Sequence, residues 1–140
     1  MRYVFLDTNV VIDFLADRRP FSIDAAKLFD LGVDGRAKIY ISAASYNNIY
    51  YIIRQSLLHN ATIKLLEELA EITEIVDVTD AIIRKSLKSD FTDYEDAIQY
   101  CCALTLPEIN FIVTRNIKDF KKSALPVLTP TEAIAAILIS

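Results

Sequence analysis

The sequence predicts a single α/β domain over residues 1–140, built as three layers, α/β/α, around a central parallel sheet of about five strands. Short apolar runs alternate along the chain with longer stretches of helical periodicity, which is the pattern of strand–helix–strand crossovers. The chain also has a common domain length, and its two glycines leave no flexible linker that would divide it. Both observations favour one continuous parallel sheet covered by helices on both faces.

Five apolar runs are the predicted strands. Each is short and is followed by polar residues, and they comprise Tyr3–Leu6, Ile39–Ile41, Glu74–Val78, Phe111–Val113 and Val127–Leu128. The stretches between them carry apolar residues three and four positions apart, for example Ala25, Leu28 and Phe29, as amphipathic helices do.

Two helix starts carry the spacing of a capping box. Thr92 is followed three residues later by Glu95, which predicts a helix with Thr92 as its N-cap. Thr129 is followed by Glu132 in the same way, with Pro130 at the first helical position. The apolar segment 133–139 is therefore expected to be a short helix packed on the domain.

Composition excludes several classes of protein. No apolar run reaches the roughly 18 residues of a membrane span, and Asp7 interrupts the first run too early for a signal peptide, so we expect a cytoplasmic protein. Cys101 and Cys102 are adjacent, which suits core packing better than a disulfide or a zinc site. His59 is the only histidine and is expected to be structural, which leaves little room for Ser-His-Asp or Cys-His catalysis.

The net charge and the scarcity of glycine exclude further classes of function. A net charge of -4 argues against binding of nucleic acid by bulk electrostatics, but it is compatible with an acidic site that divalent cations neutralise locally. With glycine only at positions 32 and 35, the chain has neither a P-loop nor a dinucleotide-binding loop.

Polar oxygen ligands follow two predicted strands and open one predicted helix. Asp7 follows the first predicted strand and Asn116 follows the fourth. Asp93 and Asp96 lie in the first turn of the predicted helix that precedes the fourth strand. The carboxyl ends of parallel strands are the usual ligand site of an open sheet. Each residue alone also suits a helix cap or a favourable helix dipole, but together they predict a carboxylate site.

Four segments resemble the motifs of the PIN-domain family, and the resemblance extends over essentially the whole chain. Residues 6–13 (Leu-Asp-Thr-Asn-Val-Val-Ile-Asp) are similar to the opening motif of the family, and residues 42–49 (Ser-Ala-Ala-Ser-Tyr-Asn-Asn-Ile) to its Ser-x-x-Ser/Thr-x-x-Glu segment. Residues 93–97 resemble the third, Asp-bearing motif and residues 114–120 the fourth. The order and spacing of the four are more specific than any one of them.

The resemblance implies a metal-dependent ribonuclease. Its catalytic residues would be Asp7, Asp96, Asn116 and Asn48, and Asp7, Asp96 and Asp93 would bind Mg²⁺ or Mn²⁺, which prefer oxygen ligands. The family implies cleavage of single-stranded or structured RNA by water. Its small toxin members, of the VapC type, imply a homodimer that a cognate antitoxin protein inhibits.

Further residues near the expected site have two interpretations. Arg115 and Lys118 are predicted to contact RNA phosphates, although solvated surface charges are the alternative. Tyr46, Tyr50 and Tyr51 lie on the helix that carries Asn48, where they suit base stacking, a partner surface or core packing.

Two other functions stay open at this stage. Asn48 stands where the family usually carries Glu, which favours, as the alternative, a catalytically weakened module that binds RNA or protein without cutting it. A flavodoxin-like signalling domain has a similar pattern of elements, but it leaves the pairing of Asp7 with Asp96 unexplained.

Overall fold

The computed structural model describes residues 1–139, which contain a five-stranded, fully parallel sheet. The strands have the spatial order β3-β2-β1-β4-β5, and their bounds are β1 (Arg2–Leu6), β2 (Ala37–Ser42), β3 (Glu74–Val76), β4 (Phe111–Val113) and β5 (Val127–Leu128). All five predicted strands are confirmed, although β3 ends two residues before the predicted Val78.

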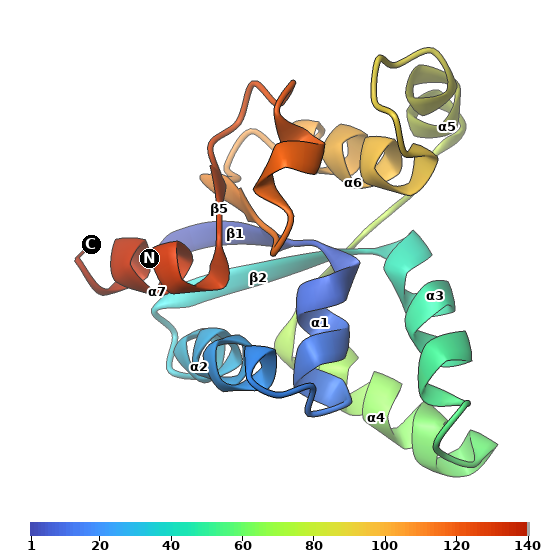
Figure 1. Ribbon diagram of the computed structural model, residues 1–140, viewed down its shortest axis with the longest axis vertical. Coiled ribbons are helices and arrows are strands. Elements are labelled where there is room, and N and C mark those ends of the chain that lie inside the picture. The colour runs from blue at the N-terminus through green and yellow to red at the C-terminus, as the bar shows by residue number, and fades with distance from the viewer. Residues whose placement is uncertain (140) are drawn as a thin grey trace.

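Helices cover both faces of this sheet, so the predicted three-layer α/β/α fold is confirmed. Figure 1 shows α1 to α4 on one side of the sheet and α5 and α6 on the other. The helical segments are α1 (Thr8–Leu15), α2 (Phe21–Val33), α3 (Ala43–Ile53), α4 (His59–Ile72), α5 (Asp80–Leu87), α6 (Tyr94–Leu104), the 3₁₀ turn η1 (Ile117–Phe120) and α7 (Pro130–Leu138).

Alternation along the strands divides the core into two clusters. Val4 and Leu6 of β1 point toward α1, α2, α3, α4 and α7, whereas Phe5 points toward α5 and α6. Strands buried on both faces must be apolar throughout, which explains the continuous apolar runs in the sequence. Cys101 and Cys102 are buried in the second cluster as free thiols, as their adjacency predicted.

The two predicted capping boxes have different outcomes. At α7 the Thr129 hydroxyl accepts from Glu132 N and the Glu132 carboxylate accepts from Thr129 N, so that box is confirmed, and the helix runs from Pro130 to Leu138. The prediction of Thr92 as the N-cap of α6 is wrong. Asp93 has the extended backbone of an N-cap, and its carboxylate accepts from Asp96 N at 3.0 Å.

The strand order places a switch point at β1. Successive crossovers carry the chain from β1 to β2 and β3 on one side, whereas β4 and β5 pair on the other side of β1. Adjacent loops leave the carboxyl ends of β1 and β4 in opposite directions, which opens a crevice between them. Within residues 1–139 no helix is long and apolar enough to cross a bilayer.

Candidate active site

A cavity of about 530 Å³ opens at the carboxyl ends of β1 and β4. It collects side chains from segments far apart in the sequence, and Asp7, Asn48, Asp93, Asp96 and Asn116 all line it. These are all of the residues that the sequence predicted as catalytic or metal-binding. The remaining lining residues are Thr8, Asn9, Ile12, Arg18, Tyr51, Ile52, Glu95 and Asp119.

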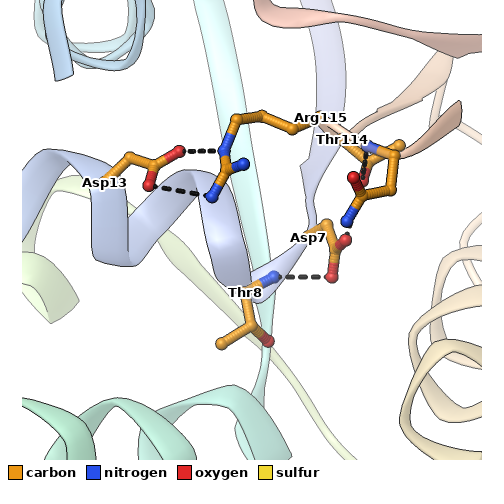
Figure 2. Close-up of polar contacts among 6 residues, drawn as sticks. Asp7, Thr8, Asp13, Thr114 and Arg115 are labelled. Atoms are coloured by element: carbon orange, nitrogen blue, oxygen red, sulfur yellow. Dashed lines mark hydrogen bonds and ion pairs between the residues drawn. The ribbon is translucent and has the colours of Figure 1, made fainter. Parts of the chain in front are cut away.

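Asp7 is the most buried acid of this cavity, with 6% of its surface exposed. It ends β1 as the N-cap of α1, and its Oδ1 accepts from Thr8 N at 2.8 Å. Its Oδ2 accepts from the Thr114 hydroxyl at 2.8 Å, and the same hydroxyl accepts from Asn116 N at 3.1 Å (Figure 2). The helix-cap interpretation of Asp7 is therefore correct, but the cap leaves lone pairs on both oxygens.

Burial raises the pKa of the Asp7 carboxyl from 3.8 to about 6. The hydrogen bonds from Thr114 and Thr8 lower it, because they stabilise the charged form, and the negative charges of Glu95 and Asp119 raise it again. Withdrawal from water is the largest of these effects.

Asp96 lies in the first turn of α6 and is half-buried. Burial and then the negative charge of Asp7 raise its pKa to about 7, with smaller contributions from Asp93, Asp119 and Glu95. Two carboxyls whose ionisation is disfavoured by burial and by nearby acids are typical of a site that binds a cation.

The two asparagines come from different sides of the cavity. Asn48 lies on α3 and is partly buried, whereas its neighbour Asn47 is exposed and does not line the cavity. Asn116 is exposed and precedes η1, and its side chain makes no capping hydrogen bond there. A cap is therefore not what accounts for Asn116.

A buried polar cluster connects the three helices that carry the site. The Gln99 amide nitrogen donates to Thr8 Oγ1 at 3.0 Å and to Ser45 Oγ at 2.8 Å, and these two hydroxyl oxygens lie 2.6 Å apart. Thr8 follows Asp7, whereas Ser45 lies on α3 three residues before Asn48 and Gln99 lies on α6 three residues after Asp96. The cluster therefore holds α1, α3 and α6 in register around the cavity.

The two predicted RNA-binding cations occupy different surroundings. Arg115 forms an ion pair with Asp13, from Nε to Oδ2 at 2.5 Å and from Nη2 to Oδ1 at 3.3 Å, and its guanidinium lies 4.1 Å from the centre of the Phe21 ring. Figure 2 shows this pair beside Asp7 but directed away from it. Lys118 is exposed and lines a separate hollow of about 250 Å³ beside Phe91 and Asp119.

Sequence reasoning missed several polar residues of the site. Glu95 was assigned to a capping box, but it is exposed and lines the cavity, because Asp93 takes the role of the cap. Gln99 is a single polar residue within an apolar run, and Thr114 directly follows an apolar strand, and these positions were the signals that could have identified them. Asn9 also lines the cavity, and its buried Oδ1 has no hydrogen-bond donor within the described residues.

The donors of the cavity fit a divalent cation such as Mg²⁺. Among residues 1–139 no three His, Cys, Asp or Glu side chains lie close enough together to hold a metal ion by themselves. Mg²⁺ needs fewer, since it commonly uses one or two carboxylates and keeps several waters. Asp7 and Asp96 meet this requirement, and the unpartnered Asn9 Oδ1 is an acceptor on the same wall.

The solved structures that share the fold of this chain include the following three. VapBC-1 from nontypeable Haemophilus influenzae aligns at 20% identity with a TM-score of 0.69, covering 92% of this chain and 98% of that chain. DNA-bound VapBC from Salmonella typhimurium aligns at 16% identity with a TM-score of 0.69, covering 93% and 99%. A toxin-antitoxin complex from Klebsiella pneumoniae aligns at 21% identity with a TM-score of 0.63, covering 91% and 97%.

The sequence also matches a family model. No curated protein matches this chain significantly. Residues 3–118, however, match the model described as PIN domain, and this segment contains every lining residue of the cavity except Asp119. The match extends over most of the chain and agrees with the fold of the three solved structures. The chain therefore belongs to the PIN-domain family.

Proposed function

We propose that this protein is a metal-dependent endoribonuclease and the toxin of a toxin-antitoxin pair. The observation that carries the proposal is the convergence of Asp7 and Asp96 in one acidic cavity, where burial and neighbouring negative charges raise both pKa values. The PIN-domain match supports the proposal, because members of this family are generally metal-dependent nucleases.

Asp7 and Asp96 would hold Mg²⁺ or Mn²⁺, with Asp93 as a further ligand. One oxygen of Asp93 already accepts from Asp96 N, so its other oxygen is the one that is free to bind. When bound, the cation polarises a phosphate and favours deprotonation of the attacking water. Asp96, whose pKa is raised by burial and then by the charge of Asp7, would be held in its ionised form as such a ligand.

The other residues of the site orient the Asp7 carboxylate and bind water or phosphate. Thr114 and Thr8 hold the Asp7 carboxylate in one rotamer, so its remaining lone pairs face a fixed direction. Asn48 and Asn116 each offer an amide oxygen and an amide donor, which suit the orientation of a water or of a phosphate oxygen. Arg115 and Lys118 are the proposed phosphate contacts, although Asp13 already neutralises Arg115.

The proposed partners follow from the fold neighbours. The chains it resembles come from VapBC and other toxin-antitoxin complexes, so we extend an antitoxin partner to this chain. A homodimer and a cytoplasmic location are part of the proposal as implications of the resemblance to small PIN-domain toxins. We also propose that residues 1–140 act as one domain, since the sheet includes strands from both ends of the chain.

The alternative is a PIN-like module that binds RNA or a protein without cutting. Asn48 favours it, because an amide at this wall of the cavity lacks the charge that a Glu would add to the cation site.

A cleavage assay with a labelled single-stranded RNA separates the two functions. We expect cleavage with Mg²⁺ or Mn²⁺, none with EDTA, and loss of at least a hundredfold in rate for Asp7→Asn and for Asp96→Asn. Asp30→Asn, an exposed acid of α2 outside the cavity, is the matched control. RNA binding without cleavage would favour the binding module, and equal cleavage by Asp7→Asn and the parent would place the chemistry elsewhere.

A further inference from the structure

Tyr51 is an exposed aromatic residue on the rim of the acidic cavity. It lies on α3, one turn after Asn48, and 70% of its surface is exposed although it lines the same cavity as Asp7 and Asp96. A large aromatic side chain normally contributes by burial, so this degree of exposure is unused binding surface.

The neighbours of Tyr51 hold that ring in place. The Tyr50 ring lies 5.1 Å from it, almost perpendicular at 87°. The Tyr50 hydroxyl is itself hydrogen-bonded to His59 Nδ1 at 2.8 Å, across the connection from α3 to α4. An edge-to-face pair anchored in this way orients Tyr51 without covering it.

Arg18 is the cation of the same cavity. Among its lining residues the acids are Asp7, Asp93, Glu95, Asp96 and Asp119, and Arg18 is the single Arg or Lys. Its side chain is exposed, and none of the ion pairs found within residues 1–139 includes it. Arg18 therefore lines a cavity of opposite charge, and its guanidinium donors are available to bind another group there.

The charge of the protein limits how such a cavity can bind a polyanion. The chain has a net charge of -4, and the cavity is lined by five acids and one arginine. Electrostatic attraction for RNA is therefore weak outside the cation site. Stacking on an aromatic ring does not depend on charge, and it requires a base that is not already paired and stacked. An exposed ring beside the cation site supplies this charge-independent affinity.

We propose that Tyr51 and Arg18 form a subsite for one unpaired nucleotide of single-stranded RNA, with the base stacked on Tyr51 and a phosphate bound by Arg18. This subsite rests on the proposed function and narrows its substrate to single-stranded segments. It selects against duplexes, whose bases have no free face at that rim.

The chain has no tryptophan, so Tyr51→Trp provides a single fluorescent reporter at the subsite. The measurement uses the Asp7→Asn background with Mg²⁺. A mixed-sequence single-stranded 12-mer RNA should quench the tryptophan fluorescence of the Tyr51→Trp variant, and the corresponding duplex should not. Val33→Trp is the matched control. Val33 is 66% exposed and ends α2, which leads to the amino end of β2, at the edge of the sheet opposite the cavity.

Binding affinities test the two roles separately. Tyr51→Ala should weaken binding of the 12-mer about tenfold, leave the salt dependence unchanged and leave the melting temperature unchanged, whereas Tyr51→Phe should bind like the parent. Arg18→Gln should weaken binding and reduce the slope of log K against log salt by about 0.7, the value for one single-strand phosphate contact. Arg36→Gln, just before the amino end of β2, should do neither.

Three results would overturn the subsite. Equal affinity of Tyr51→Ala and the parent would do so, as would equal quenching of both tryptophan variants. A change of oligomeric state in Tyr51→Ala with RNA binding unchanged would assign Tyr51 to a protein interface. The proposed nuclease function fails independently, because binding that depends on Tyr51 together with no cleavage by the parent would retain the subsite and remove only the activity.

Discussion

The Thr114 hydroxyl donates a hydrogen bond of 2.8 Å to Asp7 Oδ2, and this bond joins the carboxyl ends of β1 and β4 beside the acidic cavity. Because it lowers the pKa of a buried carboxyl, it opposes the effect of burial at the residue on which the proposed cation site depends.

Thr114→Val should therefore raise the pKa of Asp7 above about 6 and move the acidic limb of the pH–rate profile upward by about one pH unit. The variant should also unfold about 1 kcal/mol more easily, since Thr114 is fully buried and Asn116 N loses its acceptor. Thr114→Ser, which keeps the hydroxyl, is the control. An unchanged profile for the Val variant would show that this hydrogen bond does not tune Asp7.

Asp7→Asn should stabilise the metal-free protein at neutral pH. The pKa of Asp7 is about 6 in the folded chain against 3.8 ordinarily, so the folded state binds the proton more tightly. Protonated Asp7 therefore contributes up to about 3 kcal/mol to the free energy of unfolding. This contribution is fully present below about pH 4 and is lost as the pH rises through about 6. The Asn variant does not lose stability in this way, because its amide does not ionise.

Thermal melting across pH 4 to 8 in EDTA measures the difference between the two proteins. We expect the melting temperatures to converge near pH 4 and the Asn variant to melt higher at pH 7.5. Mn²⁺ should then raise the melting temperature of the parent and have little effect on the variant. If the parent is at least as stable as Asp7→Asn at pH 7.5 without metal, the raised pKa of Asp7 is contradicted.

Asn48→Glu should tighten Mn²⁺ binding about tenfold, a net gain of roughly 1 to 2 kcal/mol after the new carboxylate is desolvated and crowded against the other acids. The reason is that Asn48 shares the cavity with Asp7 and Asp96. Isothermal titration with Mn²⁺ measures the change. Asn47→Glu adds the same charge at an exposed neighbour outside the cavity, and it should leave affinity nearly unchanged. Equal effects of the two variants would mean that position 48 does not face the cation.

Arg115→Ala should destabilise the fold by about 2 to 4 kcal/mol. Asp13 is 1% exposed, and without Arg115 it is a buried charge with no cationic partner. The double variant Asp13→Asn/Arg115→Gln should recover much of this loss, because it removes both charges. Chemical denaturation of the three proteins tests this, and a double variant no more stable than Arg115→Ala would show that the cost is not electrostatic. RNA-binding assays at Arg115 therefore need the double variant as their reference.

The sequence by itself determined the sheet and the identity of the acids. Apolar runs such as Phe111–Val113 have few alternatives to a strand buried on both faces, and Asp7 directly after such a run must lie at the carboxyl edge of the sheet. Periodicity and neighbouring residues are local properties, so a linear pattern records them well.

Only the tertiary structure decided which of these groups meet and what state they are in. Strand order brought α6 and its Asp96 to the same cavity as Asp7, and burial then raised both pKa values. The backbone conformation of the folded chain made Asp93 rather than Thr92 the N-cap of α6, which freed Glu95 for the cavity. The pairing of Arg115 with Asp13 spans 102 positions, and no local pattern encodes it. Desolvation and long-range Coulomb interactions depend on distances in the folded chain, and these exist only after packing.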